Sequence, residues 1–157
     1  MVLVTLGTQR QHFARLLDYV GRMALPGEIL VQGGHTPVPE GLGREVGFIS
    51  YAEMDALVER ADIVVTHGGT GSILMALSHH KKVVACARLA RYGEHVDDHQ
   101  VEIVGAFAEA GYLIAVDEST EWEGFAERVA AFGPARFESN TDAFIARLRE
   151  SIGCAPA

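Results

Sequence analysis

The residues from His67 to Ser72 have types and spacing that suit the binding of a phosphate group. They form a glycine-rich run of His67, Gly68, Gly69, Thr70, Gly71 and Ser72. The run separates a β-branched stretch, residues 62–66, from an apolar stretch with helical spacing. Backbone N–H groups at such a helix start lack partners, and the helix macrodipole favours negative charge there. Glycines let the backbone approach phosphate oxygens, the two hydroxyls add donors, and the imidazole can donate to a diphosphate.

The same run also has a purely structural interpretation. Glycines provide the positive φ angles of a tight strand-to-helix turn, and Thr70 would then be the N-cap of the helix. Two better-known nucleotide motifs are excluded. A Walker A loop ends in Gly-Lys-Ser or Gly-Lys-Thr, and a dinucleotide fingerprint has a different glycine spacing and follows the first strand. Phosphate binding and a structural turn both stay open, and a nicotinamide cofactor is disfavoured.

A second glycine follows the first apolar run of the chain. Residues 2–6 read Val-Leu-Val-Thr-Leu, and Gly7 and Thr8 come directly after them. This turn could contact the same phosphates from the opposite side of a crevice. An ordinary strand-to-helix turn, with Thr8 as the cap of the next helix, is an equally good interpretation.

The densest polar segment of the chain is residues 91–100, Arg-Tyr-Gly-Glu-His-Val-Asp-Asp-His-Gln. Its carboxylate, amide and imidazole side chains at a helix start suit sugar hydroxyls, and the candidates are Glu94, Asp98, His99 and Gln100. His95 and His99 are four residues apart and would share a helix face, which raises the possibility of a metal site. No third ligand is evident from the sequence, so we expect no metal. Capping by Asp97 or Asp98 is the structural alternative.

Short β-branched runs alternate with amphipathic segments, which predicts an α/β fold with a doubly wound, mostly parallel, Rossmann-like sheet. The predicted strands are residues 2–6, 28–32, 46–49, 62–66, 82–87 and 112–116. The predicted helices are residues 10–23, 52–60, 71–79, 96–110 and 122–131, and a C-terminal helix over about 141–151. We expect one domain over residues 1–157. Ligands bind outside the carboxyl ends of the strands in such a sheet, so the polar segments that follow strands should form the site.

Composition and charge disfavour some classes of partner. The formal net charge is −8, whereas nucleic-acid binding depends on phosphate neutralisation by Lys and Arg. No apolar run reaches the length of about eighteen residues that a bilayer span needs. Residues 2–6 follow the first residue without a basic lead, so we interpret them as a core strand and not as a signal peptide. Cys86 and Cys154 predict no disulfide framework and fit a reducing cytoplasm.

Three motifs, in their order and spacing, resemble the C-terminal, nucleotide-sugar-binding domain of family 28 glycosyltransferases over nearly the full chain. They are residues 3–8 (LVTLGT), 61–72 (ADIVVTHGGTGS) and 92–100 (YGEHVDDHQ). Within this family the chain resembles the stand-alone PssE/EpsF-type subunits of bacterial exopolysaccharide and capsule synthesis. The resemblance implies the donor-binding half of a GT-B glycosyltransferase.

The resemblance also implies a role for each matching position. Gly7 and Thr8 would lie near the donor diphosphate, which residues 67–72 would hold, and Ile49 would lie against the uracil. The sugar hydroxyls would be held by His99 and Gln100, with Glu94 and Asp98 nearby. One position departs from the pattern. Larger relatives often place a glutamate on the helix after the phosphate loop to bind the ribose hydroxyls, and Met75 stands there in this chain.

The implied reaction is an inverting transfer of a hexosyl group from a UDP-sugar to a polyprenyl-diphosphate-linked acceptor. His67 would stabilise the diphosphate leaving group, and no metal cofactor is implied. Because the chain has length for only the donor half, the resemblance implies a membrane-anchored, PssD-like acceptor-binding subunit. That partner would supply the general base and recruit the chain from the cytoplasm to the inner face of the plasma membrane. One alternative is a non-catalytic nucleotide-sugar-binding or enhancer subunit, and another is a UDP-sugar 2-epimerase, which the length disfavours.

Overall fold

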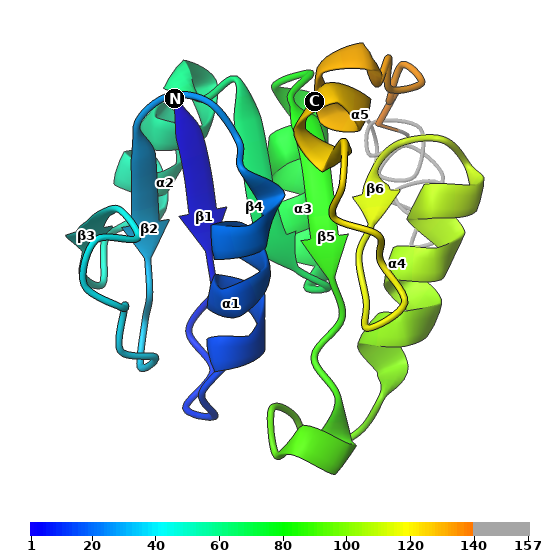
Figure 1. Cartoon of the computed structure of the whole chain (residues 1–157). Helices are drawn as coiled ribbons and strands as arrows, with labels where there is room; N and C mark the ends of the chain where they lie inside the picture. Colours follow the sequence, from blue (N-terminus) through cyan, green and yellow to red (C-terminus); the bar gives the residue numbers. More distant parts are fainter. Residues whose placement is uncertain (140–157) are drawn as a thin grey trace, which may run out of the picture.

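Six parallel strands form one sheet in the computed structural model, which describes residues 1–139 (Figure 1). They are β1 (Val2–Thr5), β2 (Ile29–Gln32), β3 (Arg44–Val46), β4 (Ile63–His67), β5 (Lys82–Cys86) and β6 (Ile114–Ala115). Their order across the sheet is β3-β2-β1-β4-β5-β6, and every neighbouring pair is parallel. The predicted α/β fold class is therefore confirmed.

Helices cover both faces of the sheet, as a doubly wound fold requires. They are α1 (Ala14–Met23), α2 (Tyr51–Arg60), α3 (Thr70–Ser78), α4 (His99–Glu109) and α5 (Phe125–Ala131), with a short 3₁₀ turn η1 (Ala90–Tyr92). One buried cluster joins Val4 and Val84 to α1 and α5, and the other joins Leu3 and Val83 to α2, α3 and α4. Neighbouring residues of a strand point to opposite faces, so an unbroken apolar strand serves both layers.

Several predicted boundaries are wrong. Helix α1 begins at Ala14 and not at residue 10, with Phe13 as N-cap, so Thr8 does not cap it. The N–H of Phe13 donates instead to Thr36 Oγ1 at 3.0 Å, which holds the preceding loop outside the helix. Strand β3 ends at Val46, and Ser50 forms a capping box with Glu53 at the start of α2. The helix expected over 141–151 lies outside the described residues.

The chain reverses its direction of travel across the sheet between β1 and β4, which are neighbours. At such a switch point the loops after the two strands diverge, and a crevice opens at their carboxyl ends. In Figure 1 these ends point downward. Among residues 1–139, no helix has the length and apolar character to cross a membrane. The loops that follow Thr5 and His67 therefore border this crevice.

Leu16 tests the packing of α1 on the sheet, because its side chain is completely buried in the cluster beneath that helix. Leu16→Ala should lower the free energy of unfolding by about 2–5 kcal/mol, since it removes buried methyl groups and leaves a cavity. Urea unfolding followed by circular dichroism measures the change. Arg22→Ala, at an exposed position of the same helix, should cost less than about 1 kcal/mol. Equal losses for the two variants would contradict this packing.

Candidate functional site

A hollow of about 410 Å³ opens at the carboxyl ends of β1 and β4, and we call it the β1–β4 hollow. Seven residues predicted to form the site line it: Gly7, Thr8, Ile49, His67, Gly69, Gly71 and Ser72. They come from the loops after β1, β3 and β4 and from the first turn of α3. Segments that are far apart in the sequence therefore meet around one space.

The N-terminus of α3 faces this hollow without a capping side chain. The N-cap is Gly69, so the prediction of Thr70 as N-cap is wrong, and Thr70 is the first helical residue. Among residues 1–139, no acceptor is found for the backbone N–H groups of Thr70 and Gly71. Two free donors at the positive end of a helix dipole form a site suited to an anion.

The side chain of His67 is held in one orientation and one protonation state. Its Nδ1 accepts a hydrogen bond from the Gly69 N–H at 2.9 Å, so in the neutral ring the proton lies on Nε2. Nε2 lies 3.3 Å from Ser72 Oγ. Burial, together with the positive charges of Arg88 and His95, lowers the pKa of His67 to about 4. His67 is thus a neutral hydrogen-bond donor at pH 7.

Two glycines allow the imidazole of His67 to lie directly against the backbone. An added Cβ at Gly69 would lie 2.1 Å from His67 Cε1. At Gly7, where φ is +75°, it would lie 2.6 Å from His67 Nε2. Neither distance is sterically possible without a shift of the ring. The glycines of the two turns are therefore required by the position of this histidine.

Gln32, which the sequence analysis did not single out, holds the Gly7 turn in place. Its Oε1 accepts from the Gly7 N–H at 3.2 Å, and its Nε2 donates to the Gly7 carbonyl at 3.2 Å. Thr5 Oγ1 donates to the same Oε1 at 2.8 Å. The sequence signal that could have pointed to Gln32 is a polar amide at the end of the predicted apolar strand 28–32.

The predicted sugar-binding segment does not line the β1–β4 hollow. Gln100 is buried, and its Oε1 accepts from the N–H groups of Gly68 at 3.0 Å and Arg88 at 3.1 Å. Glu94 is also buried, with an ion pair of 2.6 Å to Arg15. Both side chains therefore tie loops together in this structure. Gly68 packs against Gln100, where an added Cβ would lie 2.8 Å from the Gln100 Cβ.

The remaining residues of that segment bond to one another or to their own loop. Asp98 is the N-cap residue of α4, and its carboxylate accepts from the Ala90 N–H at 2.7 Å. The side chain of Asp97 is bonded to both His95 and His99. Because α4 begins at His99, the prediction that the two histidines share a helix face is wrong. Asp97 nevertheless completes a group of three possible metal ligands, which the spacing along a helix could not reveal.

Arg88 is a buried cation beneath these loops, and it donates to three backbone carbonyls. Its guanidinium contacts the carbonyls of Leu6 at 2.7 Å, Gln11 at 2.8 Å and Glu94 at 3.0 Å. It therefore connects the loop after β1 with the loop after β5. Arg88 directly follows the predicted strand 82–87, and only the tertiary structure explains why its side chain is buried.

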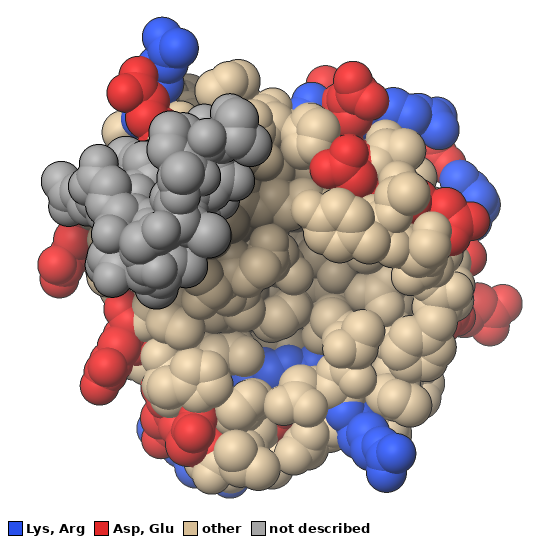
Figure 2. All heavy atoms as spheres, turned by 180° about the vertical axis from the view of Figure 1, so that it is seen from behind, with Lys and Arg blue, Asp and Glu red and all other residues tan. Residues whose placement is uncertain are grey.

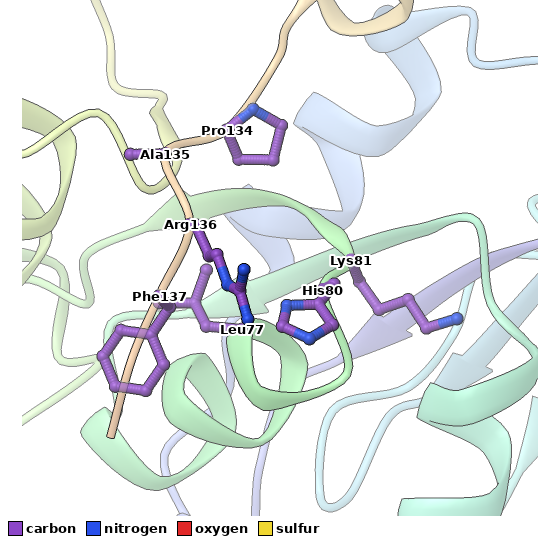
Figure 3. Close-up of a pocket in the computed structure, with 7 residues that line it drawn as sticks. All are labelled: Leu77, His80, Lys81, Pro134, Ala135, Arg136 and Phe137. Atoms are coloured by element: carbon purple, nitrogen blue, oxygen red, sulfur yellow. The ribbon is translucent and has the colours of Figure 1, made fainter. Parts of the chain in front are cut away.

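A separate hollow of about 410 Å³ lies at the opposite edge of the sheet, before β5 (Figure 3). Its lining comes from the end of α3, the turn that follows and the chain after α5: Leu77, His80, Lys81, Pro134, Ala135, Arg136 and Phe137. In Figure 3 the side chains of His80 and Arg136 approach one another, whereas Lys81 points away. None of the residues predicted to form the site is found there.

The depressed pKa of His67 predicts a loss of stability in mild acid. The unfolded chain binds a proton below its ordinary pKa of about 6.5, whereas the folded chain binds it only near pH 4. The contribution of His67 to stability is complete above pH 6.5 and declines as the pH falls to about 4. Ring ¹⁵N chemical shifts should show the Nε2–H tautomer at pH 5.5. His67→Asn should remove this part of the acid sensitivity, and a ring that titrates near pH 6.5 would contradict the assignment.

Gly69 and Gly71 provide a matched pair of variants for the turn. Gly69→Ala should displace the His67 ring and lower the free energy of unfolding by about 1–3 kcal/mol. An added Cβ at Gly71 meets no atom within 4 Å, and alanine favours a helix by up to about 1 kcal/mol. Gly71→Ala should therefore raise stability. Urea midpoints measure both changes, and midpoints that shift in the same direction would disprove the steric argument.

Comparisons with known proteins agree with this fold. Similar curated proteins include two subunits named UDP-N-acetylglucosamine transferase subunit ALG13. The one from Eremothecium gossypii is 39% identical over 72 residues, which cover 45% of this chain and 34% of that protein. The one from Saccharomyces cerevisiae is 33% identical over 69 residues, which cover 43% of this chain and 32% of that protein. The matched region thus spans about a third of the length of these relatives.

Solved structures support the fold. The forosaminyltransferase SpnP aligns with 99% of this chain and 40% of its own, with a TM-score of 0.58 and 17% identity. Arabidopsis thaliana UGT89C1 in complex with UDP-L-rhamnose aligns with 96% of this chain and 37% of its own, with a TM-score of 0.58 and 16% identity. The solution structure of ALG13 aligns over 97% of this chain and 96% of its own, with a TM-score of 0.55 and 19% identity. The six-stranded parallel sheet is that of the C-terminal halves of GT-B glycosyltransferases. The model of the glycosyltransferase family 28 C-terminal domain matches residues 1–131, and this chain belongs to that family.

Proposed function

We propose that this chain is the donor-binding, catalytic subunit of a two-component, inverting glycosyltransferase of the PssE/EpsF type. It would move a sugar from a UDP-sugar to a polyprenyl-diphosphate-linked acceptor in exopolysaccharide or capsule synthesis. The observation that carries the proposal is the β1–β4 hollow, where free N–H groups of α3 and the neutral His67 face one space. Membership of the family agrees with such a role.

The donor would lie across the carboxyl ends of the strands. Its diphosphate would accept hydrogen bonds from the first turn of α3, and its uracil would lie toward Ile49. The sugar would extend toward Glu94, Asp98, His99 and Gln100. Since the side chains of Glu94 and Gln100 already accept hydrogen bonds inside the protein, we expect donor binding to exchange some of those bonds for sugar hydroxyls.

In the transfer step an acceptor hydroxyl attacks the anomeric carbon while the bond from that carbon to the diphosphate oxygen breaks. The electron pair goes to the leaving UDP, and a general base, assigned to the partner, takes the proton of the acceptor. Negative charge therefore develops on the diphosphate, where oriented N–H donors stabilise it in a preorganised site. His67 Nε2 adds a donor without a net positive charge, and we propose that no divalent metal is needed.

Exposed hydrophobic side chains agree with a partner that covers this edge of the molecule. Those of large size among residues 1–139 are Phe48, Tyr51, Tyr92, Val96 and Val101. They lie in the segments that follow β3 and β5, or in the first turn of α4. Exposed apolar groups gathered near a binding site are typical of an interaction surface. We assign the part of this surface formed by Tyr92, Val96 and Val101 to a membrane-anchored, PssD-like acceptor-binding subunit, which would recruit the chain from the cytoplasm to the inner face of the plasma membrane.

The names of the relatives suggest the first donor to test. Both ALG13 proteins are named as subunits of a UDP-N-acetylglucosamine transferase. UDP-N-acetylglucosamine is therefore the first choice, and the UDP forms of glucose, galactose and glucuronate complete the panel.

His67→Ala should lower the rate of transfer by about a hundred- to thousand-fold, because one donor to the developing charge is lost. The measurement is transfer of labelled sugar by this chain together with its acceptor-binding partner. His67→Gln restores an N–H group and should recover part of the rate. His79→Ala, whose side chain contacts Asp55 outside the hollow, is the matched control and should leave the rate unchanged. Full activity of a folded His67→Ala variant would disprove the assignment.

A second candidate function follows from the bonds of Glu94 and Gln100. Because both side chains are bonded inside the protein, they are not free to contact a sugar in this structure. In that case the chain would bind a nucleotide sugar, or enhance its partner, without taking part in chemistry. The partner assayed alone and then with this chain separates the two functions. Substantial transfer by the partner alone, raised by wild type and His67→Ala equally, would favour the enhancer.

A further inference from the structure

The side of the β1–β4 hollow that lies between α2 and α3 is uncharged. A second hollow of about 250 Å³ adjoins it there and shares Tyr51, Met54 and Met75 with it. Among residues 1–139, no Asp, Glu, Lys or Arg lines either hollow. Figure 2 shows the molecule from behind, with most charged side chains around the rim and one blue group of Lys or Arg atoms in the lower middle. We call the part lined by Tyr51, Met54 and Met75 the thioether wall.

The thioether wall begins where the phosphate site ends. Met75 lies four residues after Gly71 and three after Ser72, so all three share one face of α3. One helical turn separates them, about 5.4 Å along the axis. A pentose attached to a phosphate at the first turn of α3 is therefore long enough to lie beside Met75, one turn further along the helix. Met54 lines the opposite side from α2.

The nucleoside, and not the transferred sugar, fits this side of the hollow. The aromatic rings of Phe48 and Tyr51 are 58% and 76% exposed, and such rings can stack on a base. Among residues 1–139, no carboxylate lines either hollow, and the carboxylates that we propose for the sugar hydroxyls lie beyond β5 at Glu94 and Asp98. The direction along α3 from phosphate to Met75 is thus the direction from phosphate to pentose.

The hydroxyl groups near this wall already have partners or lie in solvent. Ser72 Oγ lies within hydrogen-bond distance of His67 Nε2, and Thr5 Oγ1 donates to Gln32 Oε1. Tyr51 is largely exposed. A site that bonds a substrate hydroxyl rejects the analogue without it, whereas an apolar wall discriminates weakly between the two. The two methionines are soft, adaptable side chains that accept either pentose.

Resting on the proposed function, we infer that the thioether wall holds the pentose of the donor by apolar contact. The site therefore selects its nucleotide by the diphosphate and the base, and it accepts 2′-deoxyribonucleoside diphosphates as well as ribonucleoside diphosphates. Met75 is the residue that allows both pentoses to bind.

Calorimetric titration of this chain with UDP and with dUDP tests the inference, since the two ligands differ only at the 2′ position. We expect the two dissociation constants to agree within about tenfold, the range of one neutral hydrogen bond. A dissociation constant for dUDP more than tenfold above that for UDP overturns the inference and leaves the proposed function intact. If the folded chain binds neither nucleotide, the proposed function itself fails.

A substitution at Met75 provides the second test. In Met75→Glu a carboxylate would accept hydrogen bonds from the ribose hydroxyls, so the preference for UDP over dUDP should rise at least about tenfold. The ratio is the readout, because charge repulsion between the new carboxylate and the diphosphate weakens both ligands alike. Met75→Leu is the matched control and should keep the wild-type ratio. An unchanged ratio in a folded Met75→Glu variant means that the pentose does not contact Met75, and it overturns the inference.

Discussion

The hydrogen bond from the Gly69 N–H to His67 Nδ1 determines most of what this site can do. It spans two residues at the end of β4, and it fixes both the orientation of the imidazole and the nitrogen that carries its proton. Burial keeps the ring neutral, so Nε2 remains a donor that faces the hollow. The small size of Gly7 and Gly69 follows from this one contact, because any side chain there would displace the ring.

The same contact explains how a turn without charged residues can suit an anion. The donors are backbone N–H groups and a neutral imidazole, and their positions are set by the strand and the helix that flank them. A preorganised group of dipoles needs little rearrangement when charge appears, whereas a flexible lysine would have to be ordered first. Gln32, on the neighbouring strand, completes the arrangement because its side chain is hydrogen-bonded to both the backbone N–H and the backbone carbonyl of Gly7.

Local patterns were sufficient to predict the elements and the edge of the sheet at which the site lies. The β-branched run before His67 and the glycines after it already indicated a strand, a turn and a helix. The choice between Gly69 and Thr70 as N-cap was not predictable, because both residues are acceptable at that position and only the packing of His67 decides it. Glycines that serve a turn and glycines that serve a ligand look alike in a sequence.

The directions of the side chains were harder to predict from the sequence than the elements, since they depend on contacts between distant segments. Glu94 pairs with Arg15, 79 residues away, and this ion pair turns the carboxylate inward. The roles of the side chains in the segment that resembles a sugar-binding motif therefore stay predictions. The approach of Met54 and Met75 from two helices was equally invisible until the helices were packed together.

The guanidinium of Arg88 has a mechanical consequence for the two loops that it connects. It donates hydrogen bonds to carbonyls on the loop after β1 and on the loop after β5, so one side chain cross-links these two loops. A displacement of either loop strains bonds that belong to the other. We therefore expect the loop after β5 and the turn that carries Gly7 to move together, although only the second of them lines the β1–β4 hollow.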